Sequence, residues 1–254
     1  QKYFLNDSIF ELNCSFKNPL NYFKIKKKIN FIIKKYKINI VHISSRAPAF
    51  YFSKLFENNK GIKLIISIHS PLKKTNFLKN YYNSFSFKGD LVICNSYYVK
   101  DIVQKNYNLN KKIIVIERGV DTNYFKNDSN LNKIDYDNII IFNPSRITSW
   151  KGHVNLLKNF SKISSDLQKK IKFKFISSHK SKYEKELDNY INQNQLKEKI
   201  IFKKPTNEIK QEYLESNIII NSSIYPEGFG RTISESLALN IPAIATNFGG
   251  CREQ

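Results

Sequence analysis

The sequence has 254 residues, of which 41% are hydrophobic and 14% aromatic, so it can bury the core of one large domain or of two ordinary domains. It lacks any run of about 18 uninterrupted apolar residues, the length of a membrane-spanning helix, and we expect a soluble or peripheral protein. Its three cysteines lie far apart, a spacing that fits neither a disulfide framework nor a zinc site and favours a reducing cytoplasm. Because methionine is absent and the chain stops just after Gly249 and Gly250, we expect both termini to be truncated.

The formal net charge of +21 comes from 42 basic and 21 acidic residues. Lysine, asparagine and isoleucine recur along the whole chain, so we interpret the charge as coding bias toward A and T rather than as a surface for polyanions. The alternative is a basic module that binds nucleic acid or anionic lipid, which predicts aromatic residues interleaved with a basic face. The few arginines mostly adjoin glycine or proline turn signals, where a planar guanidinium suits a phosphate or carboxylate.

Short apolar runs alternate with segments of helical period, a pattern typical of parallel sheets with crossover helices. The predicted strands are residues 38–44, 63–69, 90–95, 113–117, 138–143, 172–177, 199–203, 217–221 and 242–246. The predicted helices are residues 22–36, 48–57, 76–87, 97–107, 152–163, 181–194, 207–215 and 232–239. The predicted fold class is α/β, with two Rossmann-like domains whose parallel sheets face a cleft.

A polar run of Asn, Asp and Lys interrupts this alternation at residues 121–137. We place the domain boundary there. The prediction is a partial N-terminal domain at residues 1–130 and a partial C-terminal domain at residues 131–254.

The predicted helix at residues 22–36 is amphipathic and rich in lysine, with an apolar face formed by isoleucines and a tyrosine. Two interpretations remain open. The helix is either an ordinary crossover helix with a solvated lysine face, or a surface helix that rests on an anionic membrane.

The most informative segment is residues 222–250, where a predicted strand, a loop and a helix follow one another. Gly228 and Gly230 let a ligand approach the backbone of the loop. The helix begins near Arg231 or Thr232, and its first turn presents unpaired N–H groups and a partial positive charge. This arrangement is typical of an anion site and suits a diphosphate.

Two carboxylates flank the predicted anion site. Glu227 precedes the glycines, and Glu235 lies one turn into the helix. Because like charges repel, we expect both to accept hydrogen bonds from hydroxyl groups, and a sugar nucleotide offers hydroxyl groups as well as a diphosphate. The alternative is that Glu235 only complements the helix dipole and that Glu227 is solvated.

Two cations follow the first predicted strand of the C-terminal half. Arg146 and Lys151 flank a turn at the carboxyl end of that strand, where α/β sheets bind ligands. They can neutralise a leaving diphosphate, each charge-assisted hydrogen bond contributing roughly 1.5–3 kcal/mol. The alternative for Lys151 is a plain surface lysine.

The segment Pro226-Glu-Gly-Phe-Gly-Arg-Thr-Ile-Ser-Glu235 resembles the Glu-x7-Glu signature of the retaining glycosyltransferases called family four, which have the GT-B fold and include enzymes of cell-envelope glycans. The resemblance implies that Glu227 holds hydroxyls of the donor sugar and that Glu235 holds the ribose. It extends donor binding to the residues between them, namely Gly228, Phe229, Gly230, Arg231 and Thr232.

Further segments resemble landmarks of the same family. Residues 143–153 resemble its Gly-Arg…Lys-Gly element, although Ser145 stands where glycine is usual, and this assigns Arg146 and Lys151 to the leaving diphosphate. In the N-terminal half, His69 ends a predicted strand, and its imidazole is expected to contact the donor sugar or phosphate. His42 is predicted to be a satisfied core histidine and Ser96 a helix cap.

The resemblance implies transfer of a hexosyl unit from a nucleoside diphosphate sugar to a hydroxyl of a glycan or lipid-linked acceptor, with retained configuration, in lipopolysaccharide or other envelope synthesis. We expect no metal or other cofactor, no nucleic-acid partner, and a cytoplasmic protein that can contact the inner membrane peripherally. The alternatives are another nucleotide-sugar enzyme of the same fold, or the basic module.

Overall fold

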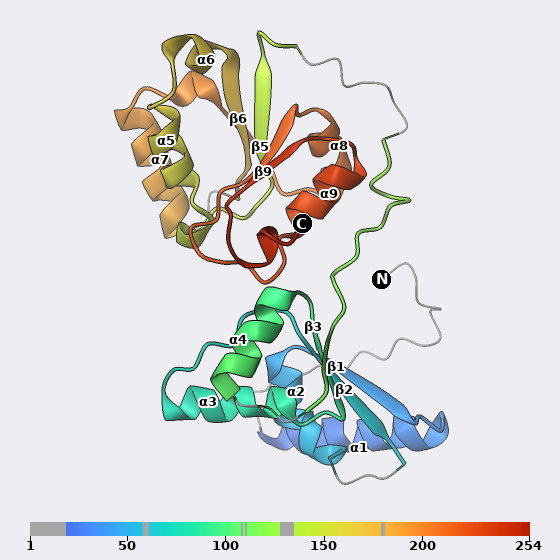
Figure 1. Cartoon of the computed structure of the whole chain (residues 1–254). Coiled ribbons are helices and arrows are strands. Elements are labelled where there is room, and N and C mark those ends of the chain that lie inside the picture. Colours follow the sequence, from blue (N-terminus) through green and yellow to red (C-terminus); the bar gives the residue numbers. More distant parts are fainter. Residues whose placement is uncertain (1–18, 58–60, 108, 110, 128–134, 179–180) are drawn as a thin grey trace. The chain divides into compact units, whose positions relative to one another are not determined.

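The computed structural model describes residues 19–57, 61–107, 109, 111–127, 135–178 and 181–254 (Figure 1). Contacts divide the chain into two compact units. One holds the residues up to Ile68 with Leu72–Ile93 and Gln104–Ile114, and the other holds His69–Pro71, Cys94–Val103 and Val115–Gln254. The predicted boundary between residues 130 and 131 lies outside the described residues.

Within the described part of the chain, the N-terminal sheet has four strands in the order β1-β2-β3-β4, and β1 runs parallel to β2 with Ile43 beside Ile66. The strands are β1 (Ile40–Ser44), β2 (Lys63–Ile68), β3 (Leu91–Cys94) and β4 (Ile113–Val115). The helices between and before them are α1 (Pro19–Lys35), α2 (Arg46–Phe52), α3 (Phe77–Ser84) and α4 (Tyr97–Tyr107). Helices thus connect successive strands, as parallel pairing requires.

The lysine-rich helix α1 packs against this sheet. Ile25 is buried in the core cluster of the sheet, and Ile29 and Ile33 pack against the same cluster, which includes Ile43 and Ile66 of the strands. Most lysines of α1 are exposed. Because the sheet covers these isoleucines, the structure supports the crossover-helix interpretation.

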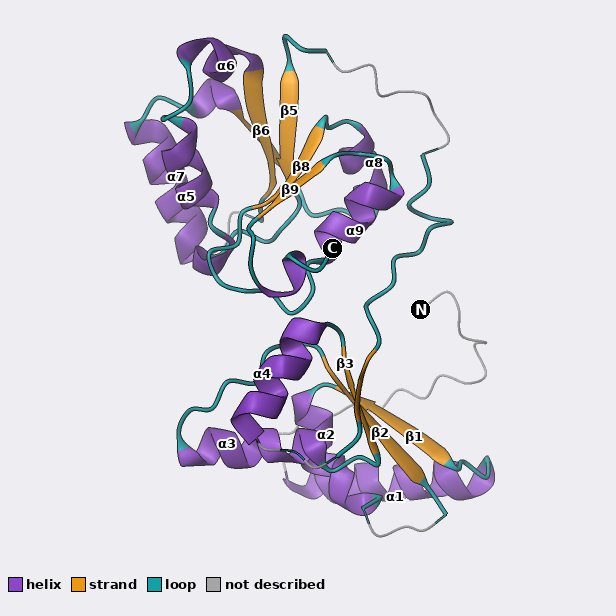
Figure 2. Ribbon diagram, viewed as in Figure 1, coloured by secondary structure: helices purple, strands orange, loops and turns teal. Residues whose placement is uncertain are grey.

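The C-terminal sheet has five strands among the described residues, in the order β7-β6-β5-β8-β9 and all parallel; β5, β6, β8 and β9 are labelled in Figure 2. They are β5 (Ile139–Asn143), β6 (Ile171–Ile176), β7 (Ile200–Lys203), β8 (Ile218–Asn221) and β9 (Ala243–Ala245). Its helices are α5 (His153–Phe160), α6 (Ser165–Lys170), α7 (Lys182–Gln193), α8 (Ile209–Leu214) and α9 (Arg231–Ala238). The chain builds outward from β5 to β7, then returns to the other side of β5 for β8 and β9, which is the doubly wound order of a Rossmann-like sheet.

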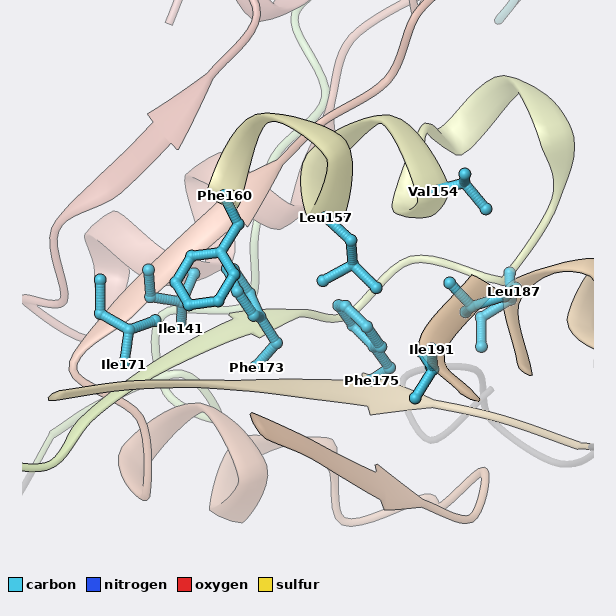
Figure 3. Close-up of a cluster of buried hydrophobic side chains, with 10 residues drawn as sticks. Ile141, Val154, Leu157, Phe160, Ile171, Phe173, Phe175, Leu187 and Ile191 are labelled. Atoms are coloured by element: carbon cyan, nitrogen blue, oxygen red, sulfur yellow. The ribbon is translucent and has the colours of Figure 1, made fainter. Parts of the chain in front are cut away.

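One face of this sheet carries an apolar core beneath α5 and α7 (Figure 3). Leu157 and Phe160 of α5 pack with Phe173 and Phe175 of β6 and with Leu187 of α7. The rings of Phe160 and Phe173 meet edge to face with centroids 5.0 Å apart. Burying each such side chain contributes roughly 1.5–3 kcal/mol, so this core holds β5 and β6 firmly.

The opposite face is covered by α8 and α9. Tyr213 of α8 is fully buried there, and its ring meets that of Phe142 of β5 edge to face. Lys174 of β6 is also buried, and its ammonium donates to the carbonyl of Glu212 at 2.8 Å and to its carboxylate at 3.1 Å. Burial lowers the pKa of Lys174, and the bonds to Glu212 oppose this shift. The pair therefore ties α8 to β6.

Two predicted helices need correction, and one helix was not predicted. Residues 48–57 contain α2, which begins earlier, at Arg46, and then a 3₁₀ turn at Ser53–Leu55; Pro48 lies in the first turn of α2, where proline is tolerated. The predicted helix 76–87 likewise ends in a 3₁₀ turn, Phe85–Phe87. Helix α6 was missed, because it buries no residue and so leaves no apolar period in the sequence.

His153 makes the stability of the C-terminal sheet sensitive to acid. It is fully buried at the start of α5, against the ring of Phe175. Burial, and then the charge of Lys151, lower its pKa from 6.5 to about 4. Between these values an unfolded chain binds a proton that the folded one does not, so stability is lost as the pH falls through this window.

Between pH 7 and pH 4, we expect the free energy of unfolding of the wild type to fall by about 3 kcal/mol more than that of His153→Leu. Urea unfolding of both proteins at the two pH values measures this difference. An identical loss of unfolding free energy in the wild type and the variant would show that His153 is not the acid-sensitive group.

Candidate functional site

The chain connections of the C-terminal sheet reverse direction between β5 and β8. These strands are neighbours, but the chain leaves β5 toward β6 on one side and β8 toward β9 on the other. The two outgoing loops, residues 144–152 and 222–230, therefore diverge and leave room at this edge. Open α/β sheets bind ligands at such a switch point.

The asparagine at the end of β5 holds the two loops together. The amide of Asn143, the last residue of β5, donates to Ser222 at 3.0 Å, and Ser222 donates in turn to the carbonyl of Lys151 at 2.9 Å. The side-chain oxygen of Asn143 also accepts a hydrogen bond from the N–H of Ser145 at 3.1 Å. Ser145 is thus accommodated where the family pattern has glycine, because its buried hydroxyl also donates to Asn143.

Gly152 is required by the close approach of the loops. Its φ is +73°, and a Cβ there would lie 2.1 Å from the carbonyl oxygen of Ser222. No other residue fits without moving the backbone. Gly152 thereby sets Lys151, the last residue of a 3₁₀ turn, beneath the second loop.

Lys151 and Glu227 form an ion pair that is nearly closed to water. Their Nζ and Oε1 atoms are 2.6 Å apart, and the side chains are only 11% and 13% exposed. Asn221 donates to the same oxygen at 2.9 Å, as does Ser223. The ammonium of Lys151 also lies 4.3 Å from the ring centroid of Trp150. Lysine and carboxylate are therefore held in one arrangement.

Glu227 is ionised and keeps one oxygen available. Burial raises the pKa of its carboxyl, but the charge of Lys151 and the hydrogen bonds from Lys151, Ser223 and Asn221 outweigh burial and lower it. All three bonds end on Oε1. Among the described residues none bonds to Oε2, so this oxygen can accept a hydrogen bond from a ligand hydroxyl.

Gly249 and Gly250 pack against the loop that carries Glu227. The N–H of Gly250 donates to the carbonyl of Glu227 at 2.9 Å, and a Cβ at Gly250 would lie 2.3 Å from the carbonyl oxygen of Gly228. Gly249 has φ +64°. Sequence reasoning used these glycines only to mark the end of the chain, although a glycine pair after a strand is itself a sign of close backbone packing.

The loop ends at Gly230, whose φ of +88° turns the chain into α9. No side chain caps this helix, and although the N–H of Ile233 donates to the carbonyl of Gly230, those of Arg231 and Thr232 can bind an anion. Thr232 in the first turn accepts a hydrogen bond from Asn221 at 3.3 Å. Phe229, which precedes Gly230, is buried.

Glu235 is held at both oxygens. Arg231 donates to Oε1 and Tyr213 to Oε2, each at 2.7 Å. Burial, with the nearby charge of Glu235, raises the pKa of Tyr213, so its hydroxyl remains a donor. Sequence reasoning missed Tyr213, because its place in the short helix α8 gives no sign that it reaches Glu235.

The remaining predicted residues are placed as follows. Arg146 is exposed and makes no hydrogen bond or ion pair within the described part of the chain, so its guanidinium is available to an anion. His69 follows the last residue of β2, in the other sheet, and is exposed.

His42 bonds to Ser67 at 2.6 Å as predicted, but it is exposed, so its placement in the core was wrong. Ser96 accepts from the N–H of Val99 at 3.1 Å and so caps α4.

The described residues contain no cluster of three or more His, Cys, Asp or Glu side chains that could hold a metal ion. None of their helices is both long and apolar enough to cross a membrane.

Profiles of two glycosyltransferase families match the chain. The profile described as glycosyl transferases group 1 covers residues 125–254, and that of glycosyltransferase family 4 covers residues 6–124. The chain therefore belongs to the group 1 glycosyl transferases, and its two sheets are those of a GT-B fold.

Particular relatives agree with this assignment. The chain is 24% identical to an uncharacterized glycosyltransferase of Methanocaldococcus jannaschii, over 95% of this chain and 64% of that protein, so it spans less than two thirds of that relative. It is 35% identical to a glycosyltransferase of Rickettsia africae, with a TM-score of 0.76, over 96% and 67% of the two chains. The fold is shared with Anabaena HepE, whose structure is a complex with UDP-glucose, at 19% identity and a TM-score of 0.77 over 93% and 67% of the two chains.

We expect Tyr213→Phe to lower the free energy of unfolding by about 1–3 kcal/mol, because it leaves a buried oxygen of Glu235 without its donor. Tyr124→Phe is the matched control, since it removes an exposed hydroxyl bonded to the carbonyl of Asn207. Urea unfolding of both variants measures the difference. Equal, small losses would contradict the role given to Tyr213.

Proposed function

We propose that the protein transfers a hexosyl unit from a nucleoside diphosphate sugar to a hydroxyl of an acceptor glycan or glycolipid, with retained anomeric configuration. The observation that carries the proposal is the buried Lys151–Glu227 pair at the switch point, beside the uncapped start of α9. This edge offers positive charge for a diphosphate and carboxylates for hydroxyls, which is the combination that a sugar nucleotide needs.

The donor diphosphate would lie against the first turn of α9. Arg146, which has no partner in the described structure, would bind it through its planar fork of donors, and Lys151 would add a second positive charge. Negative charge grows on the diphosphate as the sugar departs, so these groups stabilise the transition state more than the ground state. We propose that this charge replaces a metal and that the reaction needs no cofactor.

The two carboxylates would bind the two sugars of the donor. The free Oε2 of Glu227 would accept a hydroxyl of the hexose. Glu235 would accept the ribose hydroxyls, because each of its oxygens has a lone pair left beside the bond from Arg231 or Tyr213. Gly228, Gly230 and Thr232 would leave the backbone open to the phosphates, and the buried Phe229 would fix that backbone in place.

The retaining course of the reaction rests on the resemblance to family four. In this proposal, the acceptor hydroxyl attacks from the face on which the nucleotide leaves, and a phosphate oxygen of the donor takes its proton. His69 would bind the donor sugar or its phosphate. Synthesis of lipopolysaccharide or another envelope glycan, at the cytoplasmic face of the inner membrane, has the same support.

We expect the full-length protein, given an α-linked sugar nucleotide and an acceptor, to form an α-linked product and free nucleoside diphosphate in equal amounts. Proton NMR of the anomeric signal, recorded as the reaction proceeds, measures the configuration. A β-linked product would contradict retention, and conversion of the donor without release of nucleoside diphosphate would favour an epimerase.

In the same assay, Lys151→Gln and Glu227→Gln should each lower kcat by about 10²-fold or more, because each removes a group that acts on the donor. Each single variant also leaves a buried charge unpaired, which costs stability, so the double variant should be more stable than either single one and still inactive. Asp166→Asn is the control, since it breaks an ion pair with Lys169 that is well exposed. Full activity of either site variant would overturn the site.

A further inference from the structure

Helix α3 presents apolar side chains to solvent. Phe77 and Leu78 are 81% and 75% exposed, and Tyr81, one turn further on, is 52% exposed. These three residues, here called the α3 patch, all lie near the start of one helix. A group of large, neighbouring apolar side chains in water is a sign of a binding surface.

The first turn of α3 is held in shape by asparagines, so these side chains do not belong to a loose loop. Asn76 caps the helix by accepting from the N–H of Lys79 at 3.0 Å. Asn80 accepts from the N–H of Thr75 at 2.8 Å and donates to its carbonyl at 3.1 Å. The patch is therefore presented in one fixed geometry.

The other side of the helix is anchored, which prevents the patch from turning inward. Asn83 is buried and donates to the hydroxyl of Tyr107 in α4 at 2.9 Å. Tyr82 and Phe85 pack their rings against Phe50 of α2, with centroids 5.1 and 4.9 Å away. Because these contacts fix the rotation of α3, the outward direction of Phe77 and Leu78 is imposed by the core.

Positive charge surrounds the patch. Lys73, Lys74 and Lys79 are exposed beside it, and residues 61–89 contain no Asp or Glu. A groove of about 410 Å³ runs between α3 and the end of α4, and it is lined by Phe77 and Tyr81 together with Lys74 and Lys105. The surface therefore joins apolar area to positive charge.

We propose that the α3 patch docks the protein onto a bilayer that contains anionic lipids. Phe77 and Leu78 would enter the boundary between headgroups and acyl chains, and the lysines around them would contact the lipid phosphates. A nucleic acid would use the lysines but gains little from a protruding leucine, since leucine does not stack on bases. The inference concerns where the protein acts and does not rest on the proposed transfer reaction.

Flotation of the full chain with lipid vesicles tests the proposal. We expect binding to vesicles of phosphatidylcholine with phosphatidylglycerol, weak binding to phosphatidylcholine alone, and release as salt is raised. The double variant Phe77→Ser/Leu78→Ser should bind the anionic vesicles at least about tenfold less tightly. Lys73→Gln/Lys74→Gln should lose the preference for anionic vesicles.

Leu167→Ser is the matched control, because Leu167 is an exposed leucine next to a lysine pair on α6. It should bind vesicles as the wild type does, and circular dichroism should show every variant folded. Unchanged binding by the Phe77/Leu78 variant, or no binding by the wild type, would overturn the proposal. So would a concentration-dependent dimer that this variant abolishes while vesicle binding is absent, because the occupant would then be a second copy of the chain.

Discussion

The ion pair of Lys151 and Glu227 is the interaction on which the candidate site depends. Opposite charges so close to each other and so little exposed are held by further contacts: Glu227 also accepts from Asn221 at the end of β8, and the Lys151 ammonium lies over the ring of Trp150. Asn143 and Asn221 therefore serve two purposes, since they end the strands and orient the loops that carry the charged groups. The doubly wound strand order brings these two ends together at one edge, and Gly152 and Gly250 let the backbones approach there.

The two carboxylates of the candidate site are held in different ways. Glu227 is tied through one oxygen and keeps the other available, whereas Glu235 is tied through both and buried against Tyr213. Arg146 is different from every other charged group of the site, because it has no partner among the described residues. In the proposed reaction, an arriving diphosphate would engage Arg146 without breaking an existing contact, whereas Lys151 would act from a fixed position.

Much of the fold could be predicted from the sequence, because buried parallel strands are short runs of Ile, Val and Phe that solvated helices cannot imitate. The runs at residues 138–143 and 217–221 became β5 and β8, and the motifs that follow them came together as the switch-point rule predicts. Contacts that depend on distant parts of the chain could not be predicted. Tyr213 reaches Glu235 from α8, Gly250 packs on Gly228, and His42 is exposed although it lies in a strand. Helix α6 was missed because it has no buried side.

In the proposed function, the carboxyl edge of the C-terminal sheet binds a nucleoside diphosphate by protein charge alone. Calorimetric titration of the full-length protein with UDP, GDP and ADP, each with and without a chelator, measures this most directly. We expect one of the three to bind selectively, chelator to leave its affinity unchanged, and Arg146→Gln to weaken it. Binding that requires a divalent metal, or the absence of binding to all three nucleotides, would contradict it.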